Sequence, residues 1–331
     1  MEKKFIGIGN AIIDVLCKID DDFLKDHNLI KGSMTLIDLA IVKKLSNLSI
    51  EKISSGGSVA NSMATLASLG VNCKFFGIVG DDEFGEKFIN EIEKTNCQFI
   101  GKKIALKTSA ICYILITPDG ERTMCTYLGC ASQIDEKLIT ENDFFQADLL
   151  YLEGYLWDSD TTSNALKKAI NFVKKHRGKI AFSLSDSFCV DRHKADFINL
   201  ISNDLDILFA NEQEFLALIS QTSFNISQAK ELINKISNNN QDLLTIITRS
   251  QNGCCVINNE TLTLEVPVKK VEKIIDTSGA GDNFASGWFF GYNQNYSNLE
   301  SAKLANLLAS HIIQQIGARF DNDQIFKILK N

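Results

Sequence analysis

Residues 276–282 read Asp-Thr-Ser-Gly-Ala-Gly-Asp, so that small residues stand between two carboxylates. The apolar run 283–290 follows at once and predicts a buried helix. Gly279, Ala280 and Gly281 would leave the first backbone N–H groups of that helix uncovered. Such groups, together with the helix dipole, favour negative charge. We therefore expect this segment to hold a phosphate, or the charge that develops as a phosphate moves.

Asp282 is unusual in this setting, because a carboxylate beside an anion site repels the anion. A base that takes a proton from a hydroxyl attacking the phosphate would belong there. The alternative is a helix cap after a glycine-rich turn, which for an isolated Gly-Asp is the simpler interpretation. The segment 271–275, just before the motif, is expected to form a short strand.

A second small-residue segment contains Gly56 and Gly57 and leads into a helical pattern over residues 60–69. Paired glycines let a ligand approach the backbone, and Asn61 could offer a donor and an acceptor to a sugar diol. A plain helix start is the alternative. Asp14 interrupts an apolar strand pattern, so it needs a partner if it is buried. That partner could be a ligand hydroxyl, unless Asp14 lies on a solvated face.

A third polar segment, Asn211-Glu212-Gln213-Glu214, follows the predicted strand 207–210. Ligand sites of α/β proteins gather at the carboxyl ends of strands. Carboxylates there could organise Mg²⁺ and its waters, although acidic residues are also common in the first turn of a helix.

The elements that must position these residues alternate along the chain. This alternation predicts a mainly parallel sheet with helices on both faces. The expected strands, after a first strand near residues 5–8, are 75–79, 149–152, 179–184, 207–210 and 244–248. The expected helices are 60–69, 84–95, 159–176, 213–220, 227–237 and a late one at 300–315.

Two regions break the alternation. Residues 11–38 contain strand patterns at 12–19 and 33–38 without a long crossover helix. Residues 108–128 contain two strand patterns around a Pro-Asp-Gly-Glu turn, which is typical of a hairpin. We expect these antiparallel strands to form a small β lid that excludes water from the phosphate site.

The composition is that of a globular enzyme, with 45% apolar and 23% charged residues among 331. The net charge of −7 provides no basic field for nucleic acid or an anionic membrane. Nine scattered cysteines without a Cys-x-x-Cys pair favour buried thiols in the cytoplasm over disulfides or zinc. No membrane span, P-loop or dinucleotide fingerprint is present, and the polar run 238–241 is expected to be a surface loop.

Taken together, these segments resemble the PfkB or ribokinase-like carbohydrate kinases over nearly the whole chain. The resemblance implies that Asp282 is the catalytic base and that residues 279–282 form an anion hole. It implies that Asn211 and Glu214 order Mg²⁺ and phosphates, with Glu214 acting through water. Residues that would hold the sugar hydroxyls are Asp14, Gly56, Gly57 and Asn61, and Arg122 on the hairpin would close over the transferred phosphate.

The resemblance also implies a division into a large catalytic domain and a lid. The large domain would comprise residues 1–10, 41–105 and 131–331, and the lid residues 11–40 and 106–130. Nucleotide contacts would come from Thr248, Gly253 and Asn306, whereas Ser250 stands where the family often has glycine. A K⁺ site beside Asp276 and a monomeric or homodimeric state are further family possibilities.

Within the family the chain is most similar to the adenosine kinases, in segments such as 9–14, 75–77 and 206–209. The positions that would surround a nucleobase are apolar, as a purine face requires. They are Ile12, Leu36, Leu128, Cys130 and Leu156. The expected reaction is ATP- and Mg²⁺-dependent phosphorylation of the 5′-hydroxyl of adenosine in purine salvage. A free sugar, inosine or guanosine as acceptor, or a non-catalytic nucleoside-binding protein, are the alternatives.

Overall fold

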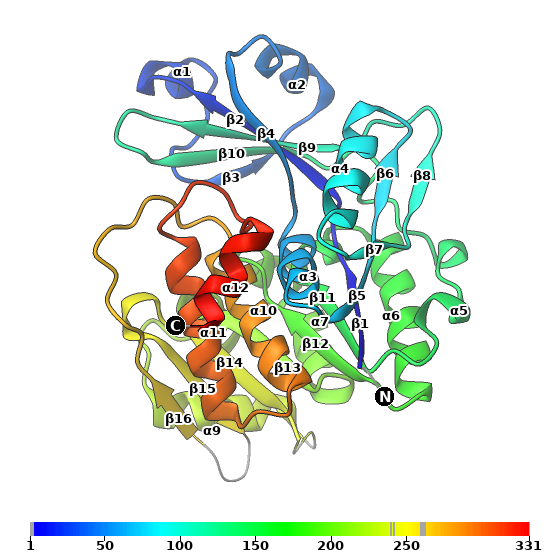
Figure 1. Cartoon of the computed structure of the whole chain (residues 1–331), viewed down its shortest axis with the longest axis vertical. Helices are drawn as coiled ribbons and strands as arrows, with labels where there is room; N and C mark the ends of the chain where they lie inside the picture. The colour runs from blue at the N-terminus through cyan, green and yellow to red at the C-terminus, as the bar shows by residue number, and fades with distance from the viewer. Residues whose placement is uncertain (1–2, 239, 241, 259–262, 331) are drawn as a thin grey trace.

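The computed structural model describes residues 3–238, 240, 242–258 and 263–330, and it contains a large and a small β-sheet (Figure 1). The large sheet has nine strands, and its first seven pair in parallel. In spatial order they are β7 (Gln98–Phe99), β5 (Asn72–Phe76), β1 (Lys4–Ile8), β11 (Leu149–Glu153), β12 (Lys179–Ser183), β13 (Ile207–Asn211) and β14 (Leu244–Thr248). The antiparallel strands β15 (Cys254–Asn258) and β16 (Thr263–Val266) complete it.

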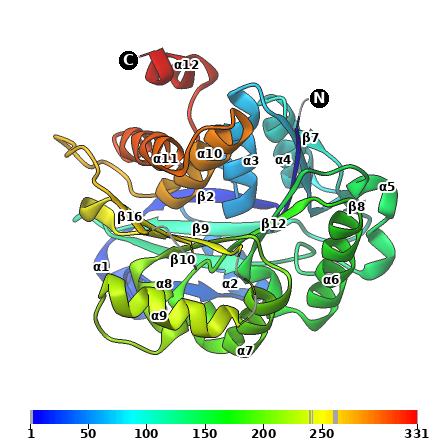
Figure 2. The ribbon, with the colours of Figure 1, turned by 90° about the horizontal axis from the view of Figure 1, so that it is seen from below.

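Helices cover both faces of the large sheet (Figure 2). One face carries α3 (Ser58–Ser68), α4 (Glu83–Glu93), α10 (Ala280–Asn293) and α11 (Asn298–Ile312), with α12 (Asn322–Lys330) outside them. The other carries α6 (Asp160–Lys175), α7 (Ser187–Asn203), α8 (Glu212–Ile219) and α9 (Ile226–Ser237), and α5 (Glu141–Phe144) lies at the edge. Neighbouring strand residues point to opposite faces, so Phe5 joins one core cluster and Ile6 the other.

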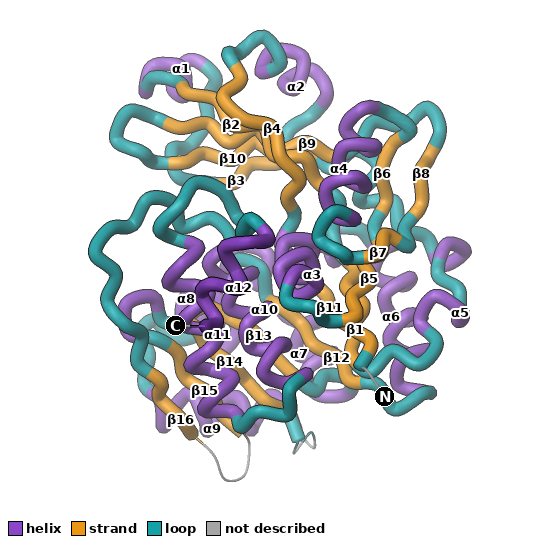
Figure 3. Tube along the Cα trace, in the orientation of Figure 1, coloured by secondary structure: helices purple, strands orange, loops and turns teal. Residues whose placement is uncertain are grey.

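The small sheet lies beyond one end of the large sheet, as the strands in Figure 3 show. Its order is β3 (Met34–Leu36), β10 (Arg122–Tyr127), β9 (Ala110–Ile116), β2 (Ile12–Lys18) and β4 (Ile50–Gly56). The pairs β2–β4 and β9–β10 are antiparallel, whereas β2–β9 and β3–β10 are parallel. The helices α1 (Asp21–Asp26) and α2 (Leu39–Leu45) connect its strands, and a two-stranded ribbon, β6 (Ile78–Gly80) with β8 (Lys102–Ile104), lies nearby.

The predicted α/β class, with a mainly parallel sheet between two helical layers, is confirmed. Several details differ from the expectations, and the strand expected at 75–79 is divided between β5 of the large sheet and β6 of the two-stranded ribbon. Strand β4 falls within the range 41–105 assigned to the large domain, yet it pairs with β2 in the small sheet. The segment 271–275 is not a strand, because the N–H groups of Ile275 and Asp276 bond to the carbonyl of Ile313 beside α11. Helix α7 was not predicted.

All nine cysteines are buried thiols. In the described part of the chain, no helix is both long and apolar enough to cross a membrane. Within the polar run 238–241, residues 239 and 241 lie outside the described residues.

Candidate active site

The N-terminus of α10 has the glycine-dependent geometry that the sequence predicts. Gly279 is its N-cap residue, with a φ of 74° in the left-handed region, and a Cβ atom there would lie 2.7 Å from Ala318 Cα. No side chain of the described residues caps this helix end. The Ala280 N–H donates to the Thr277 carbonyl at 3.2 Å, so the N–H groups of Gly281 and Asp282 are the ones left for a ligand, and Ala280 and Gly281 line a cavity.

Asp282 lies in the first turn of α10, and both of its carboxylate oxygens accept hydrogen bonds. Ser58 Oγ donates to Oδ1 at 2.7 Å, and Asn61 Nδ2 donates to Oδ2 at 2.9 Å. Burial raises the pKa of Asp282 to about 6, against the effect of these two hydrogen bonds. The carboxylate is thus poised to exchange a proton near neutral pH, as a general base requires.

Two glycines before α3 bring the backbone close to its neighbours. At Gly57, with φ of 91°, a Cβ atom would lie 2.2 Å from the carbonyl oxygen of Asn10. At Gly56 a Cβ atom would lie 2.2 Å from Asp14 Oδ2. The glycines therefore let the start of α3 pack against the end of β1 and let Asp14 lie over β4.

Asp14 projects from β2 without a hydrogen-bond donor from the residues that the structure describes. Burial raises the pKa of Asp14 to about 7; the positive charges of Arg319 and Arg122 lower it, and the negative charges of Asp282 and Asp276 raise it. An unsatisfied carboxyl group of this kind can accept a hydrogen bond from a ligand hydroxyl.

Arg122, at the start of β10, joins the small sheet to the 276–282 segment. Its Nη2 lies 2.7 Å from Asp276 Oδ2, and its Nη1 donates to Ser278 Oγ at 2.7 Å. Asp276 also accepts hydrogen bonds from the backbone N–H groups of Ser278 and Gly317. The K⁺ site at Asp276 stays a prediction, and an ion there would share this carboxylate with Arg122.

A small cavity of about 230 Å³ lies between the small sheet and the large domain. Asp14 and Arg122 line it from the small sheet, and Arg319 lines it from the loop after α11. Arg319 was not predicted as a site residue. Its contact with Asn61 spans 258 positions, so no local pattern in the sequence signals it.

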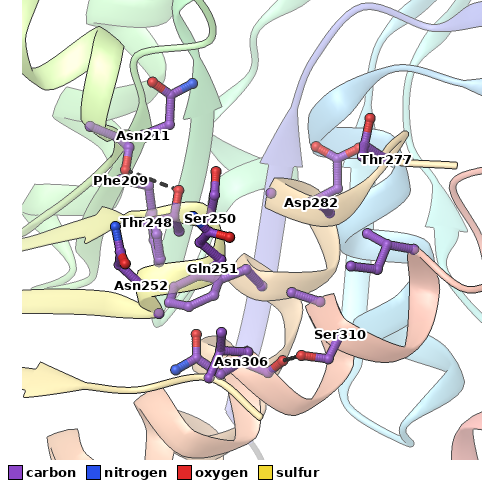
Figure 4. A pocket seen from close by; sticks show the side chains of 18 of the residues that line it. Phe209, Asn211, Thr248, Ser250, Gln251, Asn252, Thr277, Asp282, Asn306 and Ser310 are labelled. Carbon is purple, nitrogen blue, oxygen red and sulfur yellow. Dashed lines mark hydrogen bonds between the residues drawn. The ribbon is translucent and has the colours of Figure 1, made fainter. Parts of the chain in front are cut away.

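A large cavity of about 830 Å³ lies on the other side of Asp282 (Figure 4). Asp282 and Thr277 project from one side in that view, across from Asn211 and Thr248. The structure brings all five predicted nucleotide-side residues to its walls. They are Asn211, Glu214, Thr248, Gly253 and Asn306.

Asn211 and Glu214 form a capping box at the start of α8. Asn211 Oδ1 accepts from the Glu214 N–H at 2.8 Å, and Glu214 Oε2 accepts from the Asn211 N–H at 2.8 Å. Burial raises the pKa of Glu214 to about 7, and the nearby Asp186 raises it further. Residues of the capping box can also act on a metal ion, because oxygen atoms of carboxylates and amides are ligands that Mg²⁺ and its waters prefer.

The turn between β14 and β15 forms another part of the large cavity. Gly253 has a φ of 80°, and a Cβ atom there would lie 2.1 Å from the Val266 carbonyl oxygen. Ser250, which replaces the family's glycine, also lies in the left-handed region, with a φ of 48°. Asn306 Nδ2 donates to the Val266 carbonyl at 3.1 Å and so holds α11 beside β16.

The predicted apolar positions divide between two environments. Ile12 and Leu36 lie at register positions on the same face of the small sheet as Asp14. Leu128 is half-buried after β10. Cys130 and Leu156 belong to a core cluster and line neither of the two cavities, so a nucleobase contact is not apparent for them.

Glu153, at the end of β11, is a further buried acid, and the sequence analysis did not identify it. Its oxygens accept from the Asn10 N–H at 2.9 Å, from Asn10 Nδ2 at 3.0 Å and from the Val59 N–H at 2.9 Å. Burial raises the pKa of Glu153 to about 7. The carboxylate ties β1 to the start of α3 and thus fixes the segment that presents Asn61.

The chain is similar to several known proteins. The model of the pfkB family carbohydrate kinases matches residues 26–325. The solved structure of adenosine kinase from Sinorhizobium meliloti is 36% identical, with a TM-score of 0.88 over 97% of this chain and 96% of that one. A probable sugar kinase from Rhizobium etli is 32% identical, with a TM-score of 0.89 over 99% of both chains.

Adenosine kinase from Saccharomyces cerevisiae is 24% identical over 98% of this chain and 99% of its own. The chain belongs to the pfkB family of carbohydrate kinases. It is therefore a phosphotransferase, a nucleoside or sugar kinase. Use of ATP, generally with Mg²⁺, follows from membership of this family.

Proposed function

We propose that this protein transfers the γ-phosphoryl group of ATP to the 5′-hydroxyl of a purine nucleoside, with adenosine as the first choice. The observation that carries the proposal is the position of Asp282. It lines the large cavity, and its carboxylate binds Asn61 beside the Asp14 carboxyl group. A hydroxyl held by Asp14 and Asn61 would therefore reach the base from one side and the phosphate from the other.

The residues present can divide the reaction among them. Asp282 would take the hydroxyl proton as the oxygen attacks, and the N–H groups at the start of α10 would stabilise charge on the transferred group. Arg122 would leave Asp276 and Ser278, or share them, to neutralise a phosphate oxygen. Mg²⁺, when bound near Asn211 and Glu214, would neutralise the donor phosphates.

The face of the small sheet supports a nucleobase at the acceptor site. Leu16 and Ile114 are register partners that line the small cavity beside Asp14. Leu36 and Met124 continue this face on β3 and β10, with exposed fractions of 49% and 38%. An apolar surface of this kind favours a purine, whereas a free sugar has no apolar ring to cover it.

A free sugar is the second candidate acceptor, and inosine or guanosine a third. The observation behind the sugar is the polar part of the small cavity: Ser54 and Lys52 on β4 are the register partners of Asp14 and Leu16, and Glu91 of α4 also lines the cavity. The Rhizobium etli relative is also described as a probable sugar kinase. These polar groups beside Asp14 could bind the hydroxyls of a small acceptor directly.

A panel of acceptors separates these candidates. The purified protein is incubated with ATP, Mg²⁺ and adenosine, inosine, guanosine, ribose or fructose, and ADP release is measured. We expect the highest kcat/KM for adenosine. Turnover of sugars alone would refute the nucleoside proposal, and saturable adenosine binding without ADP release would indicate a non-catalytic binding protein.

A pair of leucine variants tests the apolar face itself. Leu36→Asn should raise the KM for adenosine by about 5-fold, because roughly 1 kcal/mol of apolar contact with the base is lost. The KM for ATP should not change. Leu106→Asn is the matched control, since Leu106 is fully exposed and lies outside the strands of the small sheet. An unchanged KM for adenosine in Leu36→Asn would show that the nucleobase does not contact this face of the small sheet.

A further inference from the structure

Arg319 lies in the loop between α11 and α12, and its side chain enters the wall of the small cavity. Its Nε donates to Asn61 Oδ1 at 2.9 Å, and its Nη1 donates to Ser55 Oγ at 2.5 Å. Its Nη2 makes a longer contact of 3.5 Å with the Gly56 carbonyl oxygen. All three acceptors are neutral, and no carboxylate of the described residues lies within 4.0 Å of the guanidinium group. The positive charge of Arg319 is therefore not neutralised by a direct ion pair.

Three carboxyl groups, those of Asp14, Glu91 and Asp282, nevertheless interact with this charge at longer range. Burial raises the pKa of Asp14 to about 7 and that of Asp282 to about 6, and Arg319 acts on both in the opposite direction. For Asp14 it is the strongest of the charges that act, ahead of Arg122. Because charges interact strongly in a partly buried cavity, this guanidinium favours the ionised form of both groups.

The hydrogen bond to Asn61 has a second consequence. A guanidinium N–H can only donate, so it selects the oxygen of the Asn61 amide and turns the NH₂ group toward Asp282. Without Arg319 the amide could turn over and present its oxygen to the carboxylate, which would be repulsive. The arginine thus fixes the orientation of an amide that contacts the candidate base.

The loop that carries Arg319 is held on both sides of this residue. The Gly317 N–H donates to Asp276 Oδ2 at 2.7 Å, and the Ala318 carbonyl accepts from Asn283 Nδ2 at 2.8 Å. Phe320 packs with residues of α11 and α12 in a separate apolar cluster. The guanidinium group is therefore preorganised by the C-terminal part of the chain.

We propose that Arg319 is a positioning residue of the phosphoryl-transfer site, which orients Asn61 and supplies the positive charge facing Asp14 and Asp282. The role given to Asp282 rests on the proposed function. Arg319 acts through these groups and need not touch the phosphate. The C-terminal loop thereby becomes part of the acceptor site, which the two glycine-rich motifs alone do not complete.

Kinetics of two substitutions test this role. In Arg319→Gln the charge is lost, so kcat/KM at pH 7 should fall by about 10- to 100-fold, and its acid limb should move about one unit to higher pH. Arg319→Lys keeps the charge, so its acid limb should stay near the wild-type position while the Asn61 contact weakens. Arg192→Gln is the control, because Arg192 pairs with Asp158 and lines neither cavity.

A titration provides a readout that does not need turnover. The ¹³C carboxyl resonances of the aspartates are followed with pH in the protein without substrate, and Asp14→Asn and Asp282→Asn assign the two signals. Both pKa values should be higher in Arg319→Gln than in Arg319→Lys or wild type. The other titratable or charged groups near these two carboxyls are Arg122, Asp276, Cys112, Glu153 and Tyr151, and Lys52 and Glu91 line the small cavity with Asp14.

The outcomes separate this proposal from the proposed function. If wild type prefers an acceptor other than adenosine, the pH profile is measured with that acceptor and the proposal for Arg319 is still tested. If no acceptor is turned over, the carboxyl titration decides. Unchanged pKa values of Asp14 and Asp282 in a folded Arg319→Gln protein would overturn the proposal, as would an equal loss and an equal acid-limb shift in both Arg319 variants.

Discussion

The two cavities that meet at the start of α10 are built in different ways. The polar side chains of the large cavity come mainly from short segments at the ends of strands, as in the capping box of Asn211 and Glu214. The charged residues of the small cavity come from distant parts of the chain, because Asp14, Arg122 and Arg319 meet only through the small sheet and the C-terminal loop. The large cavity is defined by local hydrogen bonds, and the small cavity is defined by packing between layers.

This difference matters for what each cavity can recognise. In the proposed function the large cavity takes the phosphate donor, and its local motifs would hold it in a fixed form. The small cavity depends on which side chains the small sheet presents, so its acceptor can change without any change in Asp282 or Asn211. The comparison teaches that the family motifs specify phosphoryl transfer more firmly than they specify the acceptor.

The largest expected effect lies at the boundary between the cavities. Asp282→Asn should reduce kcat by about 10²–10⁴, because an amide cannot take the hydroxyl proton. Binding of the acceptor should change little, since the amide that replaces the carboxylate keeps the size of the side chain. Steady-state kinetics combined with calorimetric acceptor binding measures both quantities. Near-normal turnover would remove Asp282 from the role of base.

A smaller effect is expected on the large-cavity side. Glu214→Gln should raise the Mg²⁺ concentration needed for half-maximal activity by about 10-fold, because the anionic outer ligand is lost. Glutamine can keep the hydrogen bond from the Asn211 N–H, but its NH₂ group would face Asn211 Nδ2, so a modest loss of thermal stability should accompany the change. Activity at increasing Mg²⁺ tests this, with Glu212→Gln as the control from the same helix turn. An unchanged Mg²⁺ requirement would show that Glu214 serves only as a helix cap.

The smallest expected effect concerns the turn between β14 and β15. Ser250→Gly should raise stability by about 0.5–1 kcal/mol, because serine at a φ of 48° is strained and glycine is not. Kinetic constants for the acceptor should stay the same, since this turn borders the large cavity alone. Denaturant unfolding measures the change. A loss of stability would mean that the serine side chain contributes more than the strain costs.

Much of the large domain could be predicted because its signals are local. Alternation of strand and helix patterns located β11, β13 and α6 to within a residue or two, and buried strands are continuous apolar runs. The segment 271–275 was misread because its apolar residues resemble a strand. Whether it joins a sheet depends on a partner strand, and its backbone bonds instead to Ile313.

The small sheet was harder to predict for the same reason. Strand β4 was assigned to the large domain, since its sequence does not reveal that it pairs with β2. Cys130 and Leu156 were expected near a base because the resemblance puts them at nucleobase positions and they are apolar, yet core residues and pocket residues have the same composition. Apolar character by itself does not tell which side of a layer a residue faces.

By itself, the sequence determined the parallel α/β architecture, the glycine-dependent start of α10 and the acidic capping box of α8. These features depend on backbone sterics and on hydrogen bonds between residues a few positions apart. Only the tertiary structure decided that Arg319 faces Asp14 and Asp282, and that Glu153 supports the start of α3. The contacts that show this, from Arg319 to Asn61 and from Glu153 to Val59, span 258 and 94 positions. These contacts form only when the sheets and helices pack together and bring distant segments of the chain into contact.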